Sequence, residues 1–172
     1  MFEAHSLANL SKHDQYADLR RQMTVLLAGE PNPIANAGNF SALVMASLSS
    51  LNWCAFYFYD GIELVLGPFQ GKPACLRIPL SRGVCGAAAS SRQTQLVPDV
   101  HAFPGHIACD SASRSEIVVP LVRDGALIGV WDVDSPELNR FDAVDQQGME
   151  ALCEVYLASL TEQTTLPIYP NH

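Results

Sequence analysis

Basic residues are scarce in this 172-residue chain: Lys and Arg number 10 against 18 Asp and Glu, which gives a formal net charge of −8 at pH 7. Nucleic acids and anionic membranes bind basic surfaces, so this balance argues against both as partners. Long apolar runs are also missing, since none reaches the roughly 18 residues needed to cross a bilayer. The start of the chain lacks the basic and apolar segments of a signal peptide, so we expect a cytoplasmic protein.

Paired CxxC cysteines, the usual signature of a structural zinc site, are absent as well. The chain nevertheless contains five cysteines. In a reducing cytoplasm, cysteines are more often reactive, metal-binding or buried than part of a structural disulfide frame. His106 and Cys109 share one loop with His101, which leaves a zinc or iron site open as an alternative.

The apolar fraction of 48% and the chain length are typical of one globular domain. We place this domain at 14–162, with tails at 1–13 and 163–172. Periodicity predicts helices over 14–28 and 33–48, a short helix over 87–91 and a last helix that Asp142 caps. The remaining segments predict loops over 68–73 and 99–115, and strands over 53–59, 63–66, 75–78, 95–97, 117–122 and 127–133. Helices at both ends of a hairpin-joined sheet indicate an α+β domain with a largely antiparallel sheet.

The five cysteines lie in different surroundings. Cys109 lies in the long polar loop, where a reactive thiol would be accessible, although a loop cysteine without a role fits the same pattern. Cys75 is the first residue of a predicted strand and Cys85 lies between two glycines, so each is either a site residue or a small buried hydrophobe. Cys54 and Cys153 fall in apolar stripes, which favours core packing.

Three acidic residues surround the clearest predicted hairpin. Asp132 and Asp134 alternate on a strand and therefore share one face, while Trp131 and Val133 share the other. Two buried acids side by side repel each other unless a cation lies between them. The alternative is a strand that simply runs out into solvent. Glu116 precedes the partner strand.

The register of this hairpin decides whether the three acids meet. A two-residue turn at Asp124-Gly125 pairs Ile117 with Asp132, which turns Glu116 to the opposite face. Pro120 cannot donate a hydrogen bond to the ladder, and proline in a strand often marks a bulge. We therefore predict a bulge that reverses the parity and brings Glu116 to the face of the other two acids.

Trp53 and Tyr57 are four positions apart on a predicted strand and therefore lie on one face. The pair can form an apolar wall for a methyl or thioether group. Ordinary core packing explains the same spacing.

Five sequence segments stand in a characteristic order and spacing: Leu64–Gly71, Ala74–Pro79, Arg82–Gly86, His106–Asp110 and Ser113–Leu121. Together they resemble the free methionine-(R)-sulfoxide reductases, which are GAF-domain enzymes. The resemblance covers most of residues 14–160, and most GAF domains lack such cysteines. It implies a six-stranded antiparallel sheet flanked by N- and C-terminal helices, commonly in a homodimer.

The resemblance implies a redox role for three cysteines: Cys109 as nucleophile, Cys75 as resolving cysteine and Cys85 as an auxiliary thiol able to pair with another cysteine. The implied reaction reduces free L-methionine (R)-S-oxide to methionine through a sulfenic acid and an intramolecular disulfide. Thioredoxin with NADPH is the implied external reductant, and no bound metal or organic cofactor is expected. Selectivity for R over S comes from the resemblance alone.

The resemblance also implies substrate-binding roles, with acidic anchors at Glu116, Asp132 and Asp134 and a methyl pocket at Trp53 and Tyr57. Two other readings use the same residues. One is a non-catalytic GAF module that senses a small molecule, and the other is a thiol-based redox sensor whose disulfide changes a partner interaction.

Overall fold

The computed structural model of the chain describes residues 2, 4, 6–7, 9–105 and 110–161. Its six strands form one antiparallel sheet in the order β3-β2-β1-β6-β5-β4. The α+β class and the six-stranded antiparallel sheet are thereby confirmed. In chain order the elements are α1 (Lys12–Leu26), α2 (Pro33–Ser47), β1 (Trp53–Tyr59), β2 (Glu63–Gln70), β3 (Arg77–Pro79), α3 (Gly83–Ser91), β4 (Gln95–Val97), the 3-10 helix η1 (Val100–Ala102), β5 (Ser115–Arg123), β6 (Ala126–Ser135) and α4 (Ala143–Ser159).

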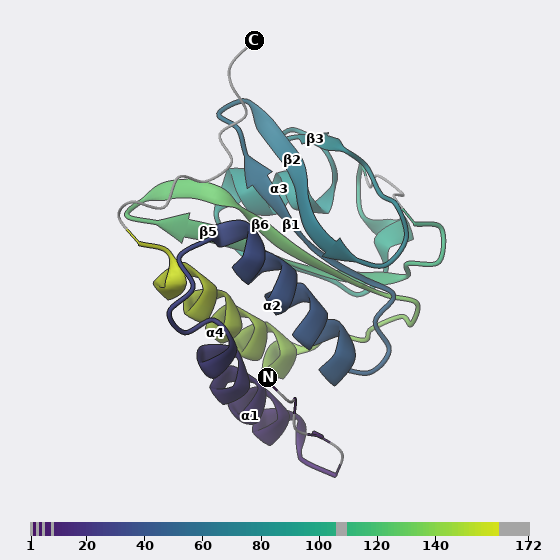
Figure 1. Cartoon of the computed structure of the whole chain (residues 1–172). Helices are drawn as coiled ribbons and strands as arrows, with labels where there is room; N and C mark the ends of the chain where they lie inside the picture. The colour runs from purple at the N-terminus through teal and green to yellow at the C-terminus, as the bar shows by residue number, and fades with distance from the viewer. Residues whose placement is uncertain (1, 3, 5, 8, 106–109, 162–172) are drawn as a thin grey trace.

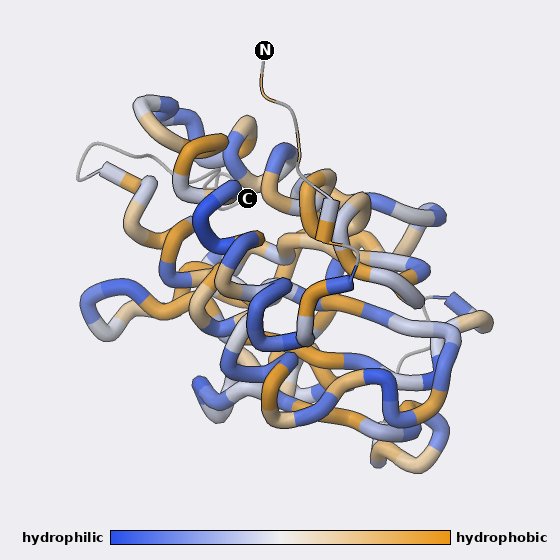
Figure 2. The backbone as a smooth tube through the Cα atoms, turned by 90° about the horizontal axis from the view of Figure 1, so that it is seen from below, coloured by the Kyte–Doolittle hydropathy of each residue, from blue (hydrophilic) through white to orange (hydrophobic). Residues whose placement is uncertain are grey.

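Helices α1, α2 and α4 gather on one side of the sheet and α3 lies on the other (Figure 1). In the backbone view of Figure 2, hydrophilic residues concentrate in the turns along the outline, and hydrophobic residues in the strands and helices between them. No helix in the described ranges has both the length and the apolar character that a membrane crossing requires.

The larger core fills the space between the sheet and helices α1, α2 and α4. Its centre is aromatic: the Phe40 ring meets those of Phe56 and Trp131 edge-on, with centroids 5.2 and 4.8 Å away. Cys54 and Cys153 belong to this core as free, buried thiols, which confirms the predicted packing role. Burial raises the pKa of Cys54 to about 12, so this thiol stays protonated at neutral pH.

Polar contacts fix the ends of the helices on this side. The Asn32 side chain accepts hydrogen bonds from the backbone at the start of α2, and Asp142 forms a capping box with Asp145 at the start of α4. The Asp145 carboxylate is fully buried and also accepts hydrogen bonds from Tyr16 and Lys12. The contacts of Asp145 with Tyr16 and Lys12 join α1 to α4. A second, smaller core lies on the opposite face of the sheet.

The smaller core lies under α3 and contains Val84, Cys85, Ala88 and Ala89 of that helix. A Cβ atom on Gly86 would stand 2.8 Å from the carbonyl oxygen of Pro79. Glycine at position 86 therefore lets α3 lie directly on the backbone after β3, which brings the adjacent Cys85 over the sheet.

The β5–β6 hairpin contains the predicted irregularity. Its register shifts between Leu121 and Val122, close to Pro120. Beyond the shift, Glu116 pairs with Asp134 and Val118 with Asp132, so the predicted reversal of parity is confirmed.

Gly129 allows the close strand contact at this bulge. A Cβ atom there would collide with the carbonyl oxygen of Tyr57 on the neighbouring strand β1. The glycine thus permits β6 to pair with β1 on one side while its register with β5 changes on the other.

Several predicted boundaries are wrong. Strand β2 continues to Gln70, into the predicted 68–73 loop, and the β1–β2 register shifts between Ala55 and Tyr57. Such a shift accommodates Pro68 within the strand. Strand β3 is Arg77–Pro79, so Cys75 lies before it rather than inside a 75–78 strand.

The third wrong boundary concerns α3, which begins at Gly83 instead of residue 87 and therefore contains Cys85. The predicted 99–115 loop is also shorter than expected. It contains η1, where the Asp99 side chain accepts a hydrogen bond from the His101 amide, and it ends where Ser115 pairs with Ser135.

Candidate active site

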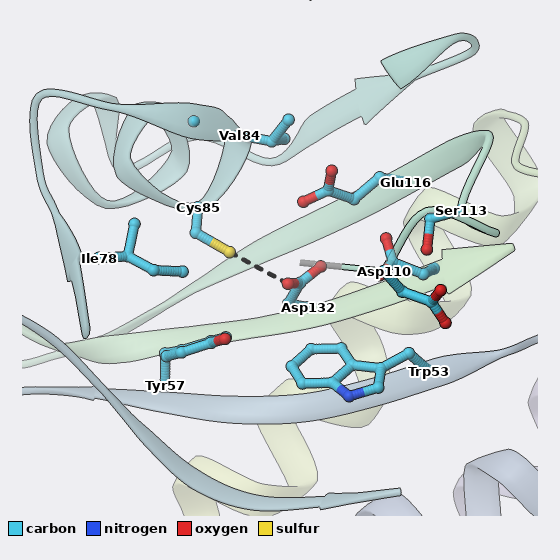
Figure 3. Close-up of a pocket in the computed structure, with 11 residues that line it drawn as sticks. Trp53, Tyr57, Ile78, Val84, Cys85, Asp110, Ser113, Glu116 and Asp132 are labelled. Carbon is cyan, nitrogen blue, oxygen red and sulfur yellow. Dashed lines mark hydrogen bonds between the residues drawn. The ribbon is translucent and has the colours of Figure 1, made fainter. Parts of the chain in front are cut away.

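A small cavity lies between α3 and the sheet, on the face opposite the three-helix layer (Figure 3). Its volume is about 30 Å³, similar to the share of one water molecule in the liquid. Six of the eight residues predicted for the site line it together: Trp53, Tyr57, Cys85, Glu116, Asp132 and Asp134.

The strand register explains this convergence. Asp134 of β6 lies between Trp53 of β1 and Glu116 of β5 in one row across the sheet. Asp132 belongs to the next row on the same face, opposite Ala55 of β1. The three acids are therefore neighbours in space, with exposed fractions of only 6 to 8%.

Asp132 is the centre of the acidic cluster. The Cys85 thiol donates a hydrogen bond to its Oδ2 atom at 3.1 Å, and Figure 3 shows the side chains of Cys85 and Glu116 pointing toward it. Burial raises the pKa of Asp132 to about 6, while hydrogen bonds from Cys85 and Glu116 oppose the rise. Its Oδ1 atom is buried and accepts no hydrogen bond from the described residues.

Burial also raises the pKa values of Glu116 and Asp134. The pKa of Glu116 lies well above its usual range because of burial, and the charges of Asp132 and Asp134 raise it further. Burial and the Asp132 charge raise the pKa of Asp134 in the same way, although a hydrogen bond with Ser113 opposes this. The three acids therefore resist ionising together, and they titrate as one coupled group.

Cys85 is a thiol rather than a thiolate in this environment. Burial raises the pKa of Cys85 well above its usual range, and the neighbouring Asp132 and Glu116 charges add to the rise. A nucleophilic cysteine needs the opposite surroundings. The predicted pairing of Cys85 with another cysteine stays untested, because Cys85 is a free thiol here.

The rim of the cavity contains two residues that were not predicted as site residues, Asp110 and Ser113. Asn52 donates hydrogen bonds to both side chains, at 3.3 and 3.0 Å, and Lys72 donates to Asp110 at 3.4 Å. The Ala112 amide and these side chains lower the pKa of Asp110. No periodicity marks loop residues of this kind, because their positions depend on contacts with distant segments.

Trp53 and Tyr57 form one wall of the cavity, as predicted, and their rings lie 5.9 Å apart. The polar groups of both side chains also donate hydrogen bonds to the backbone. The Trp53 indole donates a hydrogen bond to the carbonyl of Lys72 at 3.0 Å, and the Tyr57 hydroxyl donates one to the carbonyl of Cys75 at 2.9 Å. The same two side chains therefore line the cavity and hold the segment that contains Cys75.

Cys75 is half-buried and takes part in a disulfide. The described free thiols are Cys54, Cys85 and Cys153, so none of these is its partner. Cys109, the predicted nucleophile, lies outside the described residues, as does His106 of the alternative metal site.

Cys85, Glu116 and Asp132 also place potential metal-ligand atoms within 4.8 Å of one another. A zinc ion bound there would have to displace the thiol proton of Cys85 and the carboxyl proton of Glu116. An ammonium group can instead donate hydrogen bonds to the charged Asp132 without removing either proton. The geometry therefore suits an organic cation better than a metal ion, and the absence of a bound metal stays a prediction.

The raised pKa of Asp132 predicts a pH-dependent gain in stability for Asp132→Asn. The pKa of Asp132 is about 6 in the folded protein, whereas an aspartate in the unfolded chain has its ordinary pKa of 3.8. Ionisation of Asp132 therefore lowers the free energy of unfolding, and this loss is nearly absent below pH 4 and complete above about pH 6. We expect Asp132→Asn to raise the free energy of unfolding at pH 8 by on the order of 1–3 kcal/mol, with a smaller gain at pH 4. Urea denaturation at both pH values measures the difference.

Asp110→Asn is the matched control, because the pKa of Asp110 is lowered and its neutralisation should bring no such gain. Equal stability of the wild type and Asp132→Asn at pH 8 would contradict the account of a strained, buried carboxylate.

Comparison with known proteins agrees with this geometry. The model of the GAF domain matches residues 41–156. Free methionine-R-sulfoxide reductase from Escherichia coli (strain K12) is 51% identical over 143 residues, which are 83% of this chain and 87% of that protein. The structure of free methionine-R-sulfoxide reductase from Neisseria meningitidis in complex with its substrate is 42% identical, with a TM-score of 0.88 over 92% of this chain and 95% of that one.

A crystal structure from Burkholderia vietnamiensis, whose name proposes a GAF sensor role, is 66% identical to this chain. Its TM-score is 0.85, over 87% of this chain and 96% of that one. The identity to named reductases over most of both chains decides the family. The chain belongs to the free methionine-R-sulfoxide reductase family of GAF-domain proteins.

Proposed function

We propose that this protein reduces free L-methionine (R)-S-oxide to L-methionine with its own thiols. The observation that supports this most strongly is the position of the three buried acids. They face a cavity whose aromatic wall also holds disulfide-bonded Cys75. Family membership supplies the substrate, and the epimer preference follows from the family alone.

The acidic cluster selects a free amino acid. Asp132 and Asp134 bind the α-ammonium group of the substrate, which relieves the repulsion between them. A peptide-bound methionine sulfoxide has a neutral amide at this position and leaves the buried charge without a partner. An unpaired charge in a desolvated site costs several kcal/mol. Trp53 and Tyr57 enclose the methyl group, as the family resemblance implies.

Glu116 is the proton donor in this proposal, because its raised pKa keeps a carboxyl proton at neutral pH. The Cys109 thiolate attacks the sulfoxide sulfur while the oxygen takes up a proton. Methionine then leaves as the thioether, and the oxygen remains on Cys109 as a sulfenic acid. Asp132, which lies beside Glu116, stabilises the positive charge of the substrate throughout.

Cys75 completes the cycle. Its thiol attacks the Cys109 sulfenic acid, which forms a disulfide and releases water. An external dithiol, thioredoxin with NADPH as the electron source, returns both cysteines to thiols by exchange. The attack on the sulfoxide needs a free Cys109 thiolate, which a disulfide-bonded Cys109 cannot supply. The substrate therefore binds the reduced enzyme.

The proposal also includes the expected location, oligomeric state and domain limits of the protein. Cytoplasmic location, a homodimer and the domain limits 14–162 remain predictions. No metal or organic cofactor takes part in any step.

Thioredoxin-dependent NADPH consumption with each methionine sulfoxide epimer tests the function directly. We expect turnover with the free (R) epimer and little with the (S) epimer. Cys109→Ser should abolish methionine formation, because it removes the nucleophile. Cys75→Ser should yield about one equivalent of methionine per site and then stop, because the sulfenic acid has no resolving thiol.

Full activity of Cys109→Ser would contradict the proposed nucleophile. Absence of turnover with both epimers would favour the sensor alternatives instead. A small-molecule sensor would bind a ligand without consuming NADPH, and a thiol redox sensor would form its disulfide with peroxide but release no methionine.

Asp134→Asn tests the ammonium anchor. We expect KM for free methionine sulfoxide to rise about 10- to 100-fold, because the bound ammonium group favours ionisation of Asp134 and the substitution removes that charge. The preference for free over N-acetylated substrate should fall by a similar factor. Steady-state kinetics with both substrates gives the two ratios. Glu137→Gln is the control, since Glu137 is an exposed acid just beyond β6 and does not line the cavity. An unchanged KM in Asp134→Asn would remove the anchoring role from Asp134.

A further inference from the structure

The segment around the disulfide exposes a large apolar side chain. Leu76 follows disulfide-bonded Cys75 directly, and 74% of Leu76 is exposed. Pro73, on the other side of Cys75, is exposed as well. Single exposed aliphatic residues are common on protein surfaces, so exposure alone carries no argument. The position next to a redox-active sulfur and a rigid backbone set Leu76 apart.

Two hydrogen bonds from strands β1 and β2 hold the backbone carbonyls of Cys75 and Leu76. The carbonyl of Cys75 accepts from the Tyr57 hydroxyl at 2.9 Å, and the carbonyl of Leu76 accepts from the Leu66 amide at 3.0 Å. The side chain of Leu76 is therefore presented to solvent on a fixed backbone. A pre-ordered contact of this kind loses little conformational entropy when a partner covers it.

The charges next to Leu76 already have partners within the chain. Arg77 donates hydrogen bonds to Asp60 and Glu63, both at 2.9 Å. Lys72 lies 3.4 Å from Asp110. The apolar side chain, rather than an unpaired charge, is thus the feature that the surface offers to a partner.

We propose that Leu76, together with Pro73, is the docking contact for the dithiol protein that reduces the Cys75 disulfide. This inference rests on the proposed function. A thiolate of the reductant attacks one sulfur of the disulfide, forms a mixed disulfide and releases the other sulfur as a thiol. The second thiol of the reductant then displaces this chain, so two electrons pass to its cysteines and the reductant leaves oxidised.

The geometry of thiol–disulfide exchange indicates which protein covers Leu76 and Pro73. The attacking sulfur must reach bonding distance of the disulfide, so the protein that carries it must lie over the residues next to Cys75. A small dithiol such as dithiothreitol reaches the same sulfur without covering Leu76. Protein and small-molecule reductants should therefore respond differently to a change at position 76.

Leu76→Ser tests the docking contact, with Ile62→Ser as the matched control. Ile62 is 73% exposed but lies in the turn between β1 and β2 and does not line the site. Each variant is assayed with free methionine (R)-sulfoxide at varied thioredoxin concentration, and in parallel with dithiothreitol. We expect Leu76→Ser to raise KM for thioredoxin roughly tenfold, the loss of most of one buried leucine contact. The rate of Leu76→Ser with dithiothreitol should match that of the wild type. The rates of Ile62→Ser with thioredoxin and with dithiothreitol should also match those of the wild type. Leu76→Met, which retains the apolar surface, should restore a wild-type KM.

Two results would overturn the docking contact. One is a wild-type KM for thioredoxin in Leu76→Ser. The other is an equal loss of rate with both reductants, which would show that Leu76 acts on the disulfide site itself. Failure of the wild type to form methionine with dithiothreitol would instead overturn the proposed function, and the docking contact with it.

Discussion

The candidate active site depends on the burial of three carboxyl groups that cannot all be ionised at once. Asp132 is surrounded by the Cys85 thiol, by Glu116 and, one row further along the sheet, by Asp134. Burial raises the pKa of each acid, and the Asp132 charge raises those of the other two further. A site of this kind is costly when empty and is relieved by a cation. In the proposed mechanism the same electrostatics keep a proton on Glu116, so the proposed substrate selection and the proposed acid catalysis share one physical origin.

Much of this site could be predicted from the sequence, because strand periodicity fixes which side chains share a face. The alternation of Asp132 and Asp134, and the spacing of Trp53 and Tyr57, need only the two-residue repeat of a strand. Glu116 required one more step, a bulge near Pro120 that reverses the parity. The structure has the bulge at Leu121 and Val122, and Gly129 permits the close strand contact beside it.

Other features depend on contacts that no local pattern contains. Strand β2 passes through Pro68 with one extra residue, because residues 66–69 of β2 lie opposite residues 55–57 of β1. Asp110 and Ser113 reach the cavity because Asn52, far away in sequence, donates hydrogen bonds to both. The hydroxyl of Tyr57 binds the backbone of Cys75, so one aromatic residue links the pocket wall to the redox segment. Sequence patterns identify which face a residue occupies, whereas these links require the path of the loops in space.

Infrared spectroscopy of the ligand-free protein at pH 7 tests the central claim most directly, because protonated and ionised carboxyl groups absorb at different frequencies. The account predicts a carbonyl band from a buried, protonated carboxyl group that persists at neutral pH and weakens in Glu116→Gln. A spectrum without any protonated carboxyl band, or a band that Glu116→Gln leaves unchanged, would contradict the proton-sharing arrangement of the three acids.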